Sequence, residues 1–227
     1  MAKKKNQDEE VLVDVGSSLT KAEKFFEDNR QAITIGAAAI FVIAAAYFGY
    51  TRYYLAPLEQ EAQTKIFHAQ RLFEKDSFAE AVNGYKNYDG FLDIAADYSQ
   101  TKAGNLANYY GGISYLRLGE YENAIPLLDE FNTDDPIFSV LATTAIGDAF
   151  MELDQAEEAL EYYQKAVRGA ENSYAVPFTL QKAALTAEVL GDYEMALDYY
   201  QRIKSEYPDS KQAADIQKYI ARAEGLI

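Results

Sequence analysis

The longest run of apolar positions lies near the start of the chain, between Arg30 and Arg52, where 21 consecutive residues carry no charge. As an α-helix, this run would reach about 31 Å at about 1.5 Å per residue, close to the ~30 Å hydrocarbon core of a bilayer. Its apolar side chains point all round the helix axis, whereas a soluble helix shows one apolar stripe. We therefore predict a membrane-spanning helix over residues 31–54, with these span residues: Ile33, Ile35, Ile40, Phe41, Val42, Ile43, Tyr47 and Phe48.

Two other interpretations of the apolar run stay open. A signal peptide could be cleaved near residues 44–46, which are all alanine, but its leader would hold about 30 residues and seven acids, which is unusual. A buried helix of a soluble domain is the third possibility. The length of the run and its all-round apolar surface favour an uncleaved membrane anchor.

The distribution of Lys and Arg predicts the orientation of this anchor. Residues 1–30 contain six Lys or Arg, whereas a similar length beyond the run contains three, namely Arg52, Lys65 and Arg71. Positively charged flanks stay on the cytoplasmic side. We expect residues 1–30 to form a cytoplasmic tail. The apolar run then crosses the bacterial inner membrane, and the rest of the chain lies in the periplasm.

Beyond the run, apolar and polar positions recur in four similar segments. Each has a turn, then an aromatic or small residue, then a central alanine that lets two helices approach closely. The central residues Ala81, Ala124, Ala159 and Ala196 are spaced by 43, 35 and 37 positions. The segments are KDSFAEAVNGYKNY (75–88), LGEYENAIPLLDEF (118–131), LDQAEEALEYYQKA (153–166) and LGDYEMALDYYQRI (190–203). A period of this length predicts four helix-turn-helix units.

These segments resemble the tetratricopeptide repeat (TPR), and the resemblance covers about residues 62–210. It implies an all-α fold: a right-handed helical solenoid over residues 55–210, closed by a capping helix over 211–227 with Asp209 or Ser210 as its N-cap. Two units lack the usual turn glycine and have Asp76 and Asp154 instead. Residues 89–104 are predicted to form an extended second helix and a loop.

The TPR resemblance implies that partner proteins bind a concave face lined by the first helix of each unit. The helix predicted over residues 105–119 carries an apolar stripe, which residues 89–104 or the capping helix would alternatively cover. The mixed acidic and apolar character of the whole face favours a basic or amphipathic partner over an acidic tail. The candidate groove residues are Leu106, Tyr109, Ile113, Leu116, Arg117, Asp148, Met151, Gln181, Leu185 and Glu188.

Composition excludes several other functions. The formal charge of −15 opposes nucleic-acid binding, which needs clustered Lys and Arg. The chain has no cysteine, and its single histidine, His68, is predicted to pack inside the first unit. No Gly-rich phosphate loop or Ser-His-Asp set is present. We therefore predict no catalytic, cofactor-binding or metal-binding residues.

The complete plan of tail, single span and acidic TPR body resembles the YfgM-like ancillary subunits of the bacterial Sec translocon. That resemblance implies a non-catalytic adaptor near SecYEG, working with periplasmic chaperones such as PpiD and binding partner proteins or emerging polypeptides. The alternative is a structural scaffold subunit of another cell-envelope complex for secretion, motility or division. A mitochondrial import receptor with cytosolic repeats is a further rival.

Overall fold

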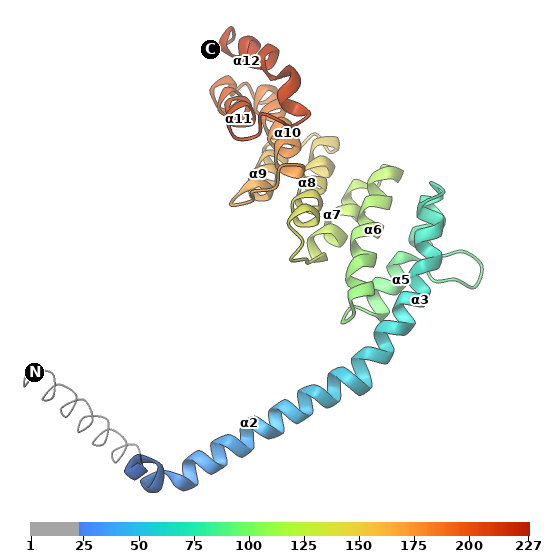
Figure 1. Cartoon of the computed structure of the whole chain (residues 1–227). Helices are drawn as coiled ribbons and strands as arrows, with labels where there is room; N and C mark the ends of the chain where they lie inside the picture. Colours follow the sequence, from blue (N-terminus) through green and yellow to red (C-terminus); the bar gives the residue numbers. More distant parts are fainter. Residues whose placement is uncertain (1–22) are drawn as a thin grey trace, which may run out of the picture. The chain divides into compact units, whose positions relative to one another are not determined.

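A computed structural model of the chain describes residues 23–227, and the regular elements in this range are all helical (Figure 1). The one β-type contact within it is an isolated bridge between Tyr85 and Tyr88. The chain divides into two compact units at the junction of Ala56 and Pro57. The all-α prediction is therefore confirmed.

The N-terminal compact unit, up to Ala56, contains the apolar helix. Helix α2 spans Arg30–Tyr50, and a π-helical turn follows over Thr51–Leu55. The eight predicted span residues all lie on α2, where no residue is buried. Together with the following residues up to Phe73, this is the one helix in residues 23–227 that is long and apolar enough to cross a membrane.

The π-helical turn has a local cause in the sequence. Pro57 lacks an N–H group, and its ring crowds the carbonyl four residues earlier. The helix widens just before this position, where the N–H of Ala56 donates to the carbonyl of Thr51, five residues back. The backbone thus stays helical through the proline position.

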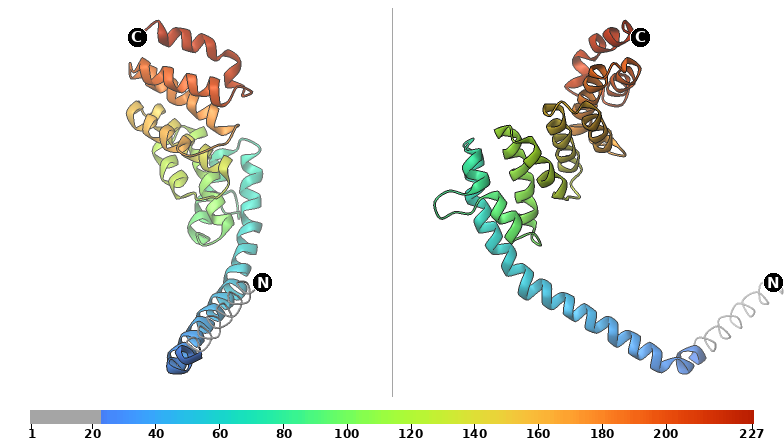
Figure 2. Two further views of the ribbon diagram at one scale, coloured as in Figure 1. Left: turned by 60° about the vertical axis from the view of Figure 1, so that its left-hand side comes forward. Right: turned by 180° about the vertical axis from the view of Figure 1, so that it is seen from behind.

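The C-terminal compact unit, from Pro57 onward, is a row of helices that pack mainly on their neighbours in the chain (Figure 2). Four successive helix-turn-helix units are followed by a closing helix, as predicted. The helices are α3 (Ala56–Phe73), α4 (Phe78–Asn83), α5 (Phe91–Asp97), α6 (Lys102–Leu118), α7 (Tyr121–Glu130), α8 (Pro136–Glu152), α9 (Ala156–Val167), α10 (Ala175–Val189), α11 (Tyr193–Glu206), the 3₁₀ turn η2 (Gln212–Asp215) and α12 (Ile216–Glu224).

The turn inside each unit has one backbone conformation regardless of its residue. Gly119 and Gly191 have φ values of 77° and 79°. Asp76 and Asp154 stand at the same place with φ values of 58° and 59°. Aspartate tolerates the left-handed region better than most residues. The two missing glycines therefore leave the repeat geometry unchanged.

Close helix contact depends on small residues at fixed positions. The central residues of the four segments (Ala81, Ala124, Ala159 and Ala196) are fully buried. Twelve positions before Ala159 lies Gly147, where an added Cβ would stand 2.5 Å from a ring carbon of Tyr163. The two helices of this unit can therefore approach closely only because this position has no side chain.

Two boundaries differ from the prediction. The second helix of the first repeat is interrupted between α4 and α5, whereas the sequence predicts that it extends into residues 89–104. Gly84 takes a φ of 87°, and the Tyr85–Tyr88 bridge closes the loop that follows. Helix α6 begins three residues earlier than predicted, because the hydroxyl of Thr101 accepts from the N–H of Gly104 at 2.9 Å and caps it.

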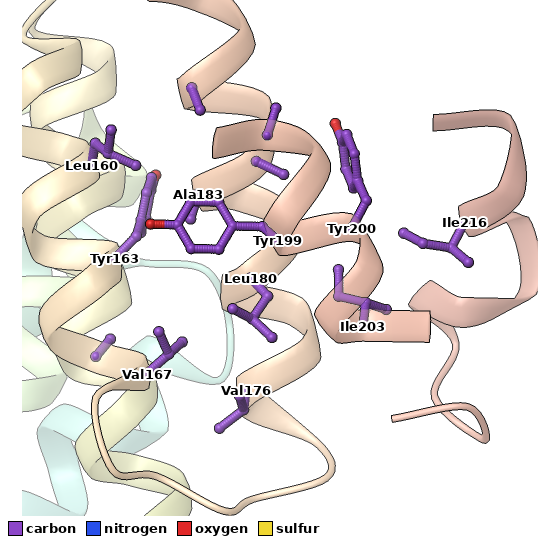
Figure 3. Close-up of a cluster of buried hydrophobic side chains, with 14 of the residues drawn as sticks. Leu160, Tyr163, Val167, Val176, Leu180, Ala183, Tyr199, Tyr200, Ile203 and Ile216 are labelled. Carbon is purple, nitrogen blue, oxygen red and sulfur yellow. The ribbon is translucent and has the colours of Figure 1, made fainter. Parts of the chain in front are cut away.

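The largest core lies between α9, α10, α11 and α12. Figure 3 shows Tyr163 of α9, Leu180 of α10 and Ile203 of α11 in this cluster, with Ile216 of α12 closing its far side. The hydroxyl of Ser210 accepts from the N–H of Ala213 at 3.2 Å at the start of the closing segment. The N-cap prediction of Asp209 or Ser210 is nevertheless wrong, because Lys211 is the N-cap of η2 and Asp215 is the N-cap of α12. The closing helix itself, α12, is shorter than the predicted 211–227.

Candidate partner-binding face

The predicted stripe on α6 is only partly open. The ring of Tyr109 packs against Phe131 at a centroid distance of 5.0 Å and against Phe138 at 5.5 Å. Ile113 also packs on the cluster formed by α7 and α8, together with Leu116. Neighbouring repeats therefore cover much of this stripe.

The start of the stripe is covered from the other side. Leu106 packs against the core cluster of the first repeat, which includes Phe91 and Ile94 of α5. The alternative that residues 89–104 cover the stripe thus applies to this end of it. At the other end, Arg117 is exposed.

Within the predicted face, the most exposed apolar line lies instead on α10. Phe178, Leu185 and Val189 are 38%, 40% and 69% exposed. They are spaced by seven and four residues, so they lie on one face of the helix. Gln181 lies in the same region and is partly exposed. The sequence pattern placed Leu185 and Gln181 on this face, and their exposure makes α10 its most accessible part.

The acidic groove residue Asp148 is engaged within the chain. The Nζ of Lys182, on the following repeat, lies 2.9 Å from its Oδ1. The hydroxyl of Tyr163, on the second helix of the same repeat, donates to the same oxygen at 2.7 Å. Burial of the ring and the nearby carboxylate of Asp148 raise the pKa of Tyr163.

The same arrangement recurs one repeat later at Glu188. The hydroxyl of Tyr200 donates to its Oε1 at 3.2 Å. The guanidinium of Arg222, on α12, forms an ion pair with Glu188. Burial, with Glu188 as the next cause, raises the pKa of Tyr200. In both places one carboxylate is held by a tyrosine of its own repeat and by a cation from the helix that begins the next repeat or closes the solenoid.

Contacts between α8 and α10 hold the third and fourth units together. The hydroxyls of Thr144 and Thr179 form a fully buried hydrogen bond of 2.7 Å. The hydroxyl of Thr186 lies 3.4 Å from the sulfur of the groove candidate Met151. Met151 therefore contributes to repeat packing as well as to the face.

A pocket opens at the start of α10. Its volume is about 380 Å³, and it lies between α8, the beginning of α10 and the segment before η2. Leu141 and Phe178 supply apolar surface, and Tyr174 is 73% exposed beside them. The other lining residues are Ser173, Ser210, Lys211 and Gln212.

His68 has a structural environment. It is half-buried and stacks on Tyr88, in the loop after α4, with a centroid distance of 4.0 Å. Within residues 23–227, no group of His, Asp and Glu side chains is arranged to hold a metal ion.

The sequence analysis did not predict the pocket, nor the ion pairs that hold Asp148 and Glu188. The ion pairs join residues from different repeats, so no local pattern shows them. The sequence did contain a signal for the tyrosine–carboxylate contacts, because Tyr163 and Tyr200 occupy equivalent positions in their segments. Tyr174 and residues 210–212 lie in connecting segments, outside the repeated pattern.

Comparisons with known proteins agree with this geometry. Two family models, both described as tetratricopeptide repeat, match residues 144–172 and 179–210. These segments contain α9 and α11 together with the later parts of α8 and α10. No curated protein matches this chain in sequence.

Solved structures with the same fold include two of MamA. The first aligns with a TM-score of 0.56 at 18% identity, covering 73% of this chain and 83% of MamA. The second has a TM-score of 0.50 at 17% identity, covering 70% and 93%. A Podosopora anserina protein described as a kinesin light chain with nearly identical TPR-like repeats gives 0.54 at 14%, covering 74% and 87%. At these identities the likeness shows the fold alone: the body is a TPR-like helical solenoid.

Proposed function

We propose that this protein is a non-catalytic, membrane-anchored TPR adaptor, ancillary to the Sec translocon and to periplasmic chaperones. Its solenoid binds partner proteins or polypeptides that emerge from the translocon. The tail of residues 1–30 is cytoplasmic, α2 crosses the inner membrane, and the solenoid is periplasmic. Residues 1–22 of the tail lie outside the described part of the structure.

The observation that carries this proposal is that, within residues 23–227, no residue of α2 is buried. The side chains of Ile40, Phe41 and Ile43 are 69%, 75% and 69% exposed. A contiguous apolar surface of this kind in water is strongly unfavourable, whereas lipid accepts it. A tethered solenoid holds its binding face close to the membrane and raises the local concentration of partners there.

Purification in mild detergent tests the assignment to the translocon. The full-length chain, tagged at its C-terminus, is expected to co-purify with SecYEG from bacterial membranes. A chain with Leu185→Asp should still bring SecYEG along if the span mediates that contact, but should capture fewer translocating polypeptides. Recovery of a different envelope complex in place of SecYEG would assign the chain to a structural scaffold.

Protease accessibility tests the orientation. Protease added to spheroplasts should digest the solenoid, whereas intact cells should protect it. Protection of the solenoid in spheroplasts would place the repeats on the cytoplasmic side and overturn the proposed topology.

A further inference from the structure

Two acids on the face around α8, α10 and α12 are already paired with cations of this chain. Asp148 is held by Lys182, and Glu188 is held by Arg222. The side chain of Glu188 is only 15% exposed, and those of Asp148 and Lys182 are 34% and 30% exposed. A charged group arriving at either pair would have to displace an existing partner and would gain little from doing so.

The surface left between these pairs is apolar. Phe178, Leu185 and Val189 form its line along α10, and Lys182 lies over the ring of Phe178 at 5.0 Å from its centroid. The ammonium of Lys182 therefore faces a ring and a carboxylate that both belong to this chain. This leaves hydrophobic contact as the main source of binding energy on this face.

The pocket beside Phe178 extends the apolar line. Its volume of about 380 Å³ suits one or two large side chains. Ser173, Ser210 and Gln212 stand around the apolar surface of Leu141 and Phe178 and can bond to peptide groups. The one charged side chain among its lining residues is Lys211.

We infer that the α10 face binds an uncharged, apolar stretch of non-native polypeptide, with a large apolar side chain seated in the pocket between Leu141 and Phe178. This inference rests on the proposed adaptor function and defines its ligand class. It replaces the expectation of a basic partner, because two of the acids on which that expectation depended, Asp148 and Glu188, are already paired within the chain.

Peptide binding to the full-length protein in lipid nanodiscs tests this inference. The probe is a short, end-capped, fluorescein-labelled peptide of alternating Leu and Ser, measured by fluorescence anisotropy. Two matched peptides carry Asp or Lys in place of some Ser and keep every Leu. The neutral peptide should bind at least about tenfold more tightly than either charged one, and its affinity should change less than about twofold with added salt.

Substitutions locate the binding to this face. Phe178→Ser should weaken the neutral peptide about tenfold or more, because it removes a large apolar contact. The control Phe67→Ser changes a phenylalanine that is 53% exposed on α3, and should leave the affinity within about twofold. Equal losses in the two variants would overturn the assignment to α10.

A charge-neutralising variant tests the role of the ion pair. Asp148→Asn keeps an oxygen that can accept from Tyr163 but frees the ammonium of Lys182. It should raise the affinity for the Asp-containing peptide about threefold at low salt. An unchanged affinity would show that internal pairing does not set the ligand class.

The two proposals can fail separately. Binding of the neutral peptide without recovery of SecYEG would leave the ligand class in place and remove the translocon assignment. Recovery of SecYEG with tighter binding of a charged peptide would do the reverse.

Discussion

At the scale of single residues, the repeats depend on positions where no side chain fits. Gly147 faces the ring of Tyr163, and a Cβ there would also lie 3.1 Å from the carbonyl oxygen of Ala159. The same ring carries the hydroxyl that bonds to Asp148. A bulkier residue at position 147 would therefore disturb both the helix packing and the inner face.

We expect Gly147→Val to lower the free energy of unfolding by about 1–3 kcal/mol, since overpacking forces the ring and the backbone to shift. The measurement is urea unfolding of the full-length protein in nanodiscs, followed by circular dichroism. Gln201→Val places the same side chain on an exposed helical position and reports the effect of helix propensity alone. Equal destabilisation of the two variants would contradict the packing explanation.

At the scale of helices, the repeat pattern predicted the elements better than the surfaces between them. The four turns and the central alanines follow from local sequence, so both could be located in advance. The break at Gly84 could not, because the repeat alignment places Tyr85 in the usual register while the backbone turns away just before it. Coverage of Tyr109 was equally hidden, because its ring partners Phe131 and Phe138 belong to the end of α7 and the start of α8.

The acids of the groove illustrate the same limit. Their positions on the inner face follow from helix periodicity, but their partners Lys182 and Arg222 lie 34 residues away in sequence, one repeat further on. Sequence can place a residue on a face. Whether that residue is free depends on the packing of the next helix.

The closing helix α12 provides the prediction at this scale. Ile216 and Ile220 are 3% and 4% exposed and cover the last repeat, where the ring of Tyr200 packs against Tyr219 of α12. Ile220→Ser should cost about 2–4 kcal/mol of local stability, because it opens a cavity and buries a hydroxyl.

Hydrogen exchange followed by mass spectrometry should show this loss in α11 and α12 and leave α6 unchanged, because each repeat of a solenoid contacts only its neighbours. Ala221→Ser, on the exposed side of α12, is the matched control. Faster exchange throughout the chain would mean that the solenoid unfolds as one cooperative unit.

At the scale of the whole molecule, the chain combines an apolar helix with a strongly acidic composition. The formal charge of −15 keeps the body soluble and disfavours contact with anionic headgroups. The body contains buried tyrosines whose hydroxyls are bonded to carboxylates. Burial raises the pKa of Tyr163 and Tyr200 in the folded state above the ordinary value of 10.0.

This shift predicts a loss of stability at alkaline pH. Below pH 10 these tyrosines are protonated in both states, so their contribution to stability is fully present. Above it, the unfolded chain releases their protons while the folded chain retains them, so the free energy of unfolding falls as pH rises. Each such tyrosine contributes at most about 1.4 kcal/mol per pH unit to this slope.

Tyr163→Phe removes one ionisable group from the folded core and should make the alkaline decline shallower by up to about 1.4 kcal/mol per pH unit. Below pH 10 the same variant should be less stable than the parent, since Asp148 loses a hydrogen bond. Urea midpoints across this pH range, read together with tyrosinate absorbance, measure both effects. Tyr174→Phe changes a side chain that is 73% exposed and should leave the slope unaltered. An alkaline slope that is equally steep in the parent and in Tyr163→Phe would show that Tyr163 ionises without unfolding, and would contradict its enclosed position beside Asp148.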